Sequence, residues 1–201
     1  MRHFTKYPST SRITAAVETV SSLDISTRKS LAHDSNDFRT LRRLADDEIP
    51  SVRQLVAHNP HTTSSILSKL AKDSDTKVRE AVANNVLTPT NVLAKLAKQR
   101  DADIQVAVAS NPVTSPDTLI ELANKENMYV QAAVARNVNT PEPALITLAN
   151  NARSSYVKMA LLDNKHCPNE IVEKFSKDSD KFLRHRAEVV LRNRSRNQSD
   201  T

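Results

Sequence analysis

A 26-residue internal repeat is the feature of this sequence that most restricts the folds open to it. Shifting the chain by 26 residues superimposes four segments without a gap: VAHNPHTTSSILSKLA (56–71), VANNVLTPTNVLAKLA (82–97), VASNPVTSPDTLIELA (108–123) and VARNVNTPEPALITLA (134–149). Val, Ala, Asn, Thr, Leu, Leu and Ala recur in fixed columns. A period in this range is typical of repeat proteins, so we expect a linear array of small units.

The repeat weakens toward both ends of the chain. A fifth copy, YVKMALLDNKHCPNEIVEKFS (156–176), follows after one inserted residue, and a degenerate copy with Leu41, Leu44 and Ala45 on the same grid precedes the regular ones. Terminal repeats that cap an array differ from the inner ones. We therefore expect a basic, partly disordered leader or capping helix at 1–22, a repeat solenoid at 23–180, and a basic cap helix and tail at 181–201.

Each unit is predicted to form two short helical segments. In one unit, Asp73 or Asp75 is placed to cap the first segment, and Asn85 to close it in left-handed geometry. Thr88 is placed to cap the second segment, with Pro89 at the first helical position. Helices this short are marginal in isolation, so stability must come from stacking unit on unit.

Composition agrees with an all-α fold that has an aliphatic core. The chain contains no Gly, no Trp, four Phe and three Tyr. Without glycine, tight hairpins and phosphate-binding loops lose the residue that adopts positive φ without strain. The predicted fold class is an all-α, right-handed helical-repeat solenoid with α/α or α/3₁₀ units of about 26 residues.

The repeat also resembles a known family. The pattern V-R-x-x-V-A-x-N-P-x-T-P followed by L-x-x-L-A-x-D is similar to the variant leucine-rich repeat, a relative of HEAT repeats, and covers about residues 46–178. Its residues in one unit are Val52, Arg53, Val56, Ala57, Asn59, Pro60, Thr62, Leu67, Leu70 and Ala71. The resemblance implies a right-handed superhelix of α- and 3₁₀-helices. The family's N-terminal iron–sulfur cysteine cluster is not carried over, because no cysteine precedes Cys167.

Columns that stay constant and columns that vary suggest different roles. The Asn column is interpreted as structural, because a surface specific for one partner has no reason to repeat one residue five times. Function is expected where the units differ, immediately before the Asn and two residues after it. The predicted partner-binding residues are His58, Asn84, Ser110, Arg136, His61 and Asn139. The alternative, that these are solvated turn positions free to vary, stays open.

The net charge of +6 raises a nucleic-acid hypothesis. Residues 46–150 carry 10 Lys and Arg against 12 Asp and Glu, so the basic excess lies at the two ends. The candidate contacts are Arg184, Arg186, Arg192, Arg194 and Arg196. A solubilising cap is the alternative use of this tail. A second column, Arg53, Arg79, Gln105, Gln131 and Lys158, could also serve ion pairs within or between units.

Little in the sequence indicates chemistry. Cys167 beside His166 is the best nucleophile and base pair, but adjacent turn residues usually point apart. His58 and His61 lack a convincing third metal ligand. We predict no catalytic residue, no cofactor, no metal, no small-molecule substrate and no membrane association. The predicted function is a cytoplasmic, non-enzymatic protein–protein interaction scaffold or adaptor; the alternative is a nucleic-acid-binding repeat protein using its basic ends.

Overall fold

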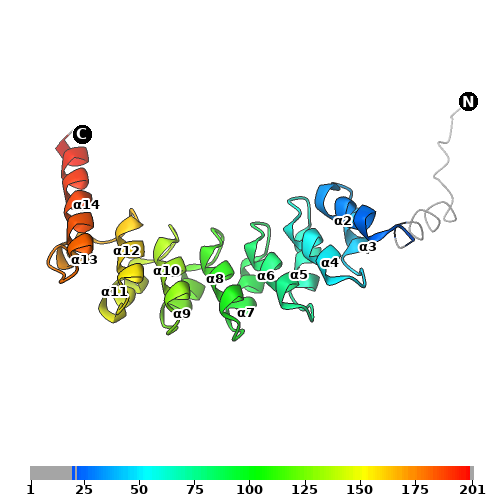
Figure 1. Cartoon of the computed structure of the whole chain (residues 1–201), viewed down its shortest axis with the longest axis horizontal. Coiled ribbons are helices and arrows are strands. Elements are labelled where there is room, and N and C mark those ends of the chain that lie inside the picture. The colour runs from blue at the N-terminus through cyan, green and yellow to red at the C-terminus, as the bar shows by residue number, and fades with distance from the viewer. Residues whose placement is uncertain (1–19, 21, 200–201) are drawn as a thin grey trace, which may run out of the picture. The chain divides into compact units, whose positions relative to one another are not determined.

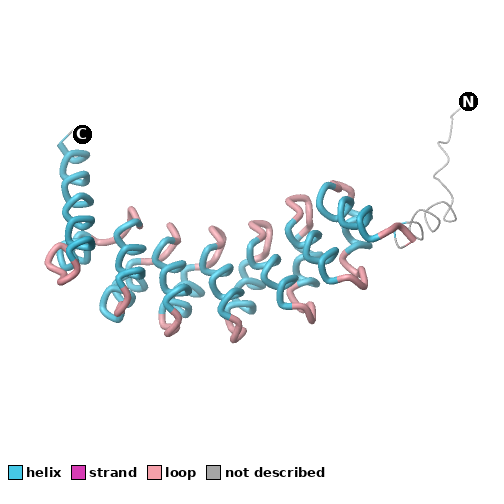
Figure 2. Tube along the Cα trace, viewed as in Figure 1, coloured by secondary structure: helices cyan, strands magenta, loops and turns pink. Residues whose placement is uncertain are grey.

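The computed structural model describes residue 20 and residues 22–199, and every regular element within them is an α-helix (Figure 2). The predicted leader at 1–22 lies, apart from residues 20 and 22, outside this range. The chain divides into two compact units after Thr88. No helix in the described part is both long and apolar enough to cross a membrane.

The first unit, residues 1–88, stacks one degenerate helix pair on the regular repeats. Its helices are α2 (Ile25–Asp34), α3 (Phe38–Leu44), α4 (Pro50–His58), α5 (Ser64–Leu70) and α6 (Thr76–Asn84). The first helices of successive repeats contact one another, α2 with α4 and α4 with α6. Leu41, Leu44 and Ala45 of the degenerate copy are buried, as the 26-residue grid predicts.

The second unit, residues 89–201, has two rows of helices. Its helices are α7 (Thr90–Ala97), α8 (Ala102–Ser110), α9 (Pro116–Ala123), α10 (Met128–Arg136), α11 (Glu142–Asn151), α12 (Ser155–Asp163), α13 (Asn169–Phe175) and α14 (Lys181–Ser199). One row runs α8, α10, α12 and α14, and the other runs α7, α9 and α11 (Figure 1).

The core lies between these rows and consists of the constant apolar columns. Val108, Leu119 and Leu122 have no exposed surface, and their counterparts in the other repeats are equally buried. The predicted all-α helical-repeat fold is confirmed. Both helices of every described repeat are α-helices, so the α/α arrangement holds and the α/3₁₀ arrangement does not.

The helix starts confirm one capping prediction and correct another. The carboxylate of Asp75 accepts the N–H groups of Lys77 and Val78 and caps α6. Thr88 does not cap α7, which begins at Thr90 with Pro89 at the cap position. The Thr88 hydroxyl instead donates to the Val82 carbonyl in α6, at 2.5 Å. Carbonyls in the last turn of a helix lack their usual intrahelical partner, and the hydroxyl supplies a donor to one of them.

The helix ends correct the prediction of left-handed geometry. Asn85 has φ −77° and ψ 125°, and no described residue has positive φ. The Asn85 Oδ1 atom accepts the Leu87 N–H at 2.9 Å, which turns the chain without a left-handed residue. Its Nδ2 donates to the carbonyls of Ala57 and Asn59 in the preceding repeat, at 2.8 and 3.2 Å.

The same bonds recur at Asn137 and Asn164. Asn137 donates to the carbonyls of Ala109 and Asn111, at 2.7 and 3.0 Å, and accepts the Asn139 N–H. Asn164 donates to the carbonyls of Ala135 and Asn137. The predicted structural role of the Asn column is therefore confirmed: it ends a helix and bonds one repeat to the next.

Residues of a second column bond several of the first helices to the loop that precedes them. Arg79 donates to the carbonyls of Asp73 and Ser74, and Gln131 donates to the carbonyl of Lys125. Arg53 also binds the Asp73 carboxylate through Nε and Nη2, at 2.6 and 2.8 Å. The predicted use of this column for pairing between repeats is confirmed for Arg53.

Replacing Asn137 with Ala should destabilise the protein. The change leaves the Ala109 carbonyl without this donor in a buried site and removes the side-chain donor to the Asn111 carbonyl and the side-chain acceptor of the Asn139 N–H. A buried unsatisfied polar group costs about 1–3 kcal/mol, and each lost hydrogen bond adds to this. We expect a loss of roughly 2–4 kcal/mol, measured by urea denaturation followed by circular dichroism. The exposed Asn151 provides the control, since Asn151→Ala should change stability by about 0.5 kcal/mol at most. Equal midpoints for both variants would contradict the proposed role.

The Arg53–Asp73 pair should make stability depend on pH. Partial burial by itself raises the pKa of Asp73. The hydrogen bonds from Arg53 and from the Asp75 N–H have the opposite effect and together outweigh burial, so the pKa of Asp73 lies below its usual value. The contribution of Asp73 is thus complete above the pKa of unfolded aspartate, about 3.9, and is lost as the pH falls through the lower folded pKa.

Asp73→Asn should therefore cost roughly 2 kcal/mol at pH 7 and progressively less below about pH 4, by urea denaturation at each pH. Glu121→Gln, on an exposed face of α9, is the control and should show a small difference at every pH. If the loss of unfolding free energy in the Asp73→Asn variant stayed constant as the pH falls below about 4, the charge of Asp73 would not be involved.

Candidate functional site

The exposed face of the first helices in the second unit is where the repeats differ most. On α10 this face contains Tyr129 and Arg136, which are spaced i and i+7 and share one side of the helix, and the buried Ala133 lies between them. The residues of α10 that belong to the constant columns, such as Val130 and Val134, are buried in the core. The face is therefore free to vary without disturbing the core.

An aromatic residue starts this face on three consecutive first helices. Tyr129 of α10 is 57% exposed, Tyr156 of α12 is 44% exposed and Phe182 of α14 is 84% exposed. Each of them comes immediately before the buried Val or Leu of its helix. The equivalent residue on α8 is Asp103. Since the chain has only seven Phe and Tyr, placing three of them on one exposed face points to a binding role.

Two of these aromatic residues form a cluster with an arginine. The rings of Tyr129 and Tyr156 meet edge to face with centroids 6.0 Å apart. The Arg136 guanidinium lies 4.8 Å from the centre of the Tyr156 ring, and its Nη1 atom donates to the Tyr156 hydroxyl at 3.1 Å. We call Tyr129, Arg136 and Tyr156 the tyrosine–arginine cluster. Stacking and hydrogen bonding hold its guanidinium in one orientation.

A hollow of about 300 Å³ adjoins the cluster. Its walls include Val106 and Ser110 of α8, Tyr129, Ala133 and Arg136 of α10, and Tyr156 of α12. Apolar side chains thus line part of the hollow, and a cation and hydroxyl groups line the rest.

The predicted partner-binding residues lie in different surroundings. Ser110 and Arg136 both line the hollow. His58 and Asn84 are exposed at the ends of α4 and α6 in the first unit. His61 is exposed in the turn after α4.

The turn column after the Asn contacts the neighbouring repeat in the second unit. The Asn139 Nδ2 atom donates to the Pro112 carbonyl at 2.6 Å, and the His166 Nδ1 atom lies 2.9 Å from the Val138 carbonyl. Asn139 is thus already bonded to the turn of the preceding repeat.

Sequence reasoning missed Tyr129 and Tyr156. A signal was present, because the column Ser51, Lys77, Asp103, Tyr129, Tyr156 and Phe182 becomes aromatic in a chain with few aromatic residues. It also lies seven residues before the column of Arg136, and hence on the same helical face.

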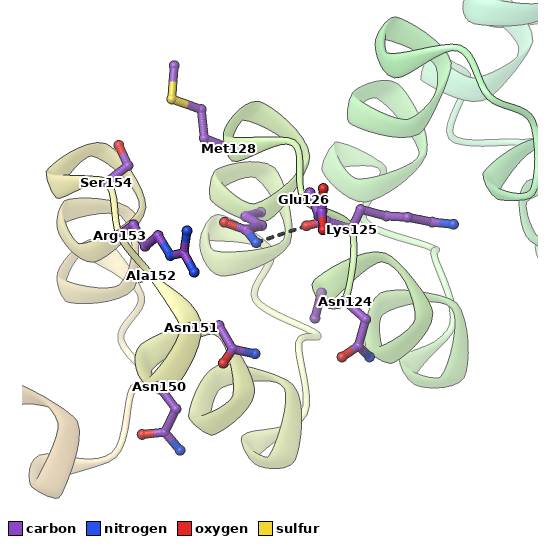
Figure 3. Close-up of a pocket in the computed structure, with 11 residues that line it drawn as sticks. Asn124, Lys125, Glu126, Met128, Asn150, Asn151, Ala152, Arg153 and Ser154 are labelled. Carbon is purple, nitrogen blue, oxygen red and sulfur yellow. Dashed lines mark hydrogen bonds between the residues drawn. The ribbon is translucent and has the colours of Figure 1, made fainter.

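A second cavity, of about 670 Å³, lies where the repeat carries its inserted residue. It opens between the α9–α10 and α11–α12 loops, and Figure 3 shows the hydrogen bond from Gln131 to the Lys125 carbonyl on one side of it. Lys158, at the equivalent position of α12, binds Asp178 instead. In Figure 3 Arg153 points toward α10 whereas Lys125 points away, so the two cations do not converge on one ligand.

The sequence neighbours His166 and Cys167 are not a catalytic pair in the structure. Cys167 is buried, and this burial raises the pKa of its thiol to about 11. His166 is exposed and faces the Val138 carbonyl. A thiol with this pKa is almost entirely protonated at neutral pH and therefore a poor nucleophile. Among the described residues no group of three or more His, Cys, Asp or Glu is placed to hold a metal ion.

Arg184, Arg186 and Arg194 of the tail contact their own chain. Arg184 donates to the carbonyls of Asp178 and Ser179, and Arg186 pairs with Asp163 at 2.8 Å. Arg194 donates to the Cys167 carbonyl and to Asn169, both at 2.7 Å. Arg192 and Arg196 are exposed. These contacts connect α14 to the last repeat.

Comparison with known proteins adds one structural likeness. No family model matches the chain, and no curated protein matches it either. Among solved structures, a designed armadillo repeat protein in complex with the peptide (KR)4 aligns with a TM-score of 0.35 and 13% sequence identity, covering 92% of this chain and 94% of that one. The fold assignment rests on the helices and contacts described above.

The buried thiol predicts slow modification of the native protein. At pH 8, Cys167 should react with an aromatic disulfide reagent at least tenfold more slowly than a free cysteine, whose pKa is about 8.5, and should react fully in urea. Ser110→Cys in a Cys167→Ser background places a thiol on the exposed face and should react quickly without urea. Rapid native labelling of Cys167 itself would contradict its burial.

Proposed function

We propose that this chain is a non-enzymatic helical-repeat scaffold that binds another protein through the exposed face of α8, α10, α12 and α14. The tyrosine–arginine cluster is the observation that supports this most directly. Tyr and Arg are enriched among the few residues that contribute most of the energy of protein interfaces. Here both lie next to a hollow able to receive a partner's side chain.

The rigidity of the cluster favours tight binding. Arg136 would otherwise lose rotamer freedom when a partner orders it, at a cost of about 0.5–1.5 kcal/mol. Its contacts with Tyr156 have already restricted that freedom. The neighbouring exposed aromatic residue, Phe182, extends the apolar surface onto the next first helix.

The difference between constant and varying columns of the repeat supports a scaffold rather than an enzyme. Constant columns fill the core and bond repeat to repeat, whereas the residues that differ lie on the exposed face. Such a protein works by burying interface area through variable positions on a fixed framework. The proposal keeps Ser110 and Arg136 from the predicted binding residues and adds Tyr129, Tyr156 and Phe182.

The finer identity proposed is a variant leucine-rich or HEAT-like repeat adaptor. The pattern V-R-x-x-V-A-x-N-P in the repeats supports this class. A cytoplasmic location is part of the proposal, because a single cysteine suits a reducing compartment. A nucleic-acid function is less favoured, since Arg184, Arg186 and Arg194 bind their own chain.

Site-specific photo-crosslinking tests the proposed face. A photo-reactive phenylalanine analogue at Phe182 should capture a discrete partner from a cell extract, whereas the same analogue at Ile146, which is exposed on α11 in the other row, should not. Tyr129→Ala with Tyr156→Ala should reduce capture at least tenfold, because each hot-spot side chain contributes about 2 kcal/mol.

The tyrosine variants should remain folded, with a change in stability of about 1 kcal/mol or less, since both side chains are largely exposed. Capture from Ile146 alone, or capture at Phe182 that ignores both tyrosines, would place the interface elsewhere.

A further inference from the structure

Resting on the proposed function, we propose that the partner inserts an acidic side chain at Arg136 and an apolar side chain into the adjoining hollow. The partner is thus a protein segment with the local pattern Asp or Glu, any residue, then an apolar residue.

Arg136 has an unused hydrogen-bonding edge. Its Nη1 atom is bonded to the Tyr156 hydroxyl, and the Tyr156 ring lies against its guanidinium. No carboxylate in the described part of the chain forms an ion pair with it. The Nε and Nη2 donors remain for a ligand, and this edge of arginine matches a carboxylate bidentately.

The same chain shows this arrangement completed at another arginine. Arg53 binds both carboxylate oxygens of Asp73 through Nε and Nη2, while its Nη1 atom is bonded to the Asp47 carbonyl. Arg136 likewise has Nη1 engaged by an oxygen of its own chain, and lacks only the carboxylate. An acidic side chain from a partner would complete at Arg136 the geometry that Asp73 completes at Arg53.

The hollow determines what accompanies the acid. Its wall contains the apolar side chains of Val106 and Ala133 and the ring of Tyr129. At about 300 Å³ it lies at the lower end of ligand pockets, which span about 300–1,000 Å³, so it suits one side chain. In an extended segment, residues i and i+2 point to the same side and lie about 7 Å apart. The acid and the apolar residue should therefore be separated by one residue.

Charge distinguishes this partner from a basic peptide and from a nucleic acid. Arg136 is the only charged residue lining the hollow and would repel a Lys or Arg side chain placed there. A polyanion would need further cations along the face, but Asp103 on α8 and Asp163 on α12 occupy the columns of Tyr129 and Arg136 there. A single carboxylate meets the single cation without approaching a row of carboxylates.

A random nine-residue peptide library displayed on phage and selected on the intact chain tests the proposal. Selected peptides should be enriched in an acid followed two residues later by Leu, Ile, Phe or Met. Synthetic versions should lose affinity at least tenfold when the acid becomes its amide, and equally when Arg136→Gln is introduced. Arg136→Lys should restore only part of the affinity, because lysine keeps the charge but loses the fork.

Arg100→Gln is the matched control, because Arg100 is exposed in the same unit outside this face; it should bind like the wild type. Urea denaturation should show Arg136→Gln to be as stable as Arg100→Gln.

Peptides that depend on Tyr129 and Tyr156 but bind Arg136→Gln unchanged would overturn the inference and leave the proposed function standing. So would tight binding of single-stranded DNA that Arg136→Gln abolishes, as the occupant would then be a nucleic acid. Selection of no peptide, or of peptides indifferent to all three residues of the cluster, would overturn both.

Discussion

The hydrogen bonds of the buried asparagines, as at Asn85 and Asn137, are the interaction on which the rest of this structure depends. One side chain ends the first helix of a repeat, turns the chain toward the second and bonds to the backbone of the repeat before it. Because the amide is buried, it cannot exchange these partners for water without cost. Within each unit, consecutive repeats are therefore joined in a defined register, and the turns in the described part of the chain use neither glycine nor positive φ.

In a framework joined in this way, the residues on the exposed face of a first helix are not needed for the core or for the bonds between repeats. The buried Val, Ala and Leu columns and the Asn column hold the backbone, so residues on the exposed face can change from repeat to repeat. Neighbouring helices then bring different residues together. The contact between Arg136 and Tyr156 joins positions 20 residues apart in the chain, and it exists because α10 packs beside α12.

Several elements followed directly from the sequence, and others did not. The period, the paired helices, the buried columns and the structural asparagines were predictable, since each depends on spacing along a single helix or on a repeated residue. The roles of Thr88 and Asn85 were predicted incorrectly in detail. Both roles depend on which backbone group a short polar side chain reaches in three dimensions. Thr88 reaches the Val82 carbonyl and Asn85 reaches the preceding repeat, and the spacing of residues along the sequence does not show either contact.

The sequence by itself determined the repeat, its all-helical character and the candidacy of Arg136 as a residue free to specialise. Only the tertiary structure decided that Arg136 stacks on Tyr156, that Tyr129 completes the cluster and that a hollow opens beside them. The physical reason is that periodicity places a side chain on a face of its own helix. Contacts between faces of different helices depend on how one repeat packs against the next. The spacing of residues along the sequence does not give the distance between two packed helices.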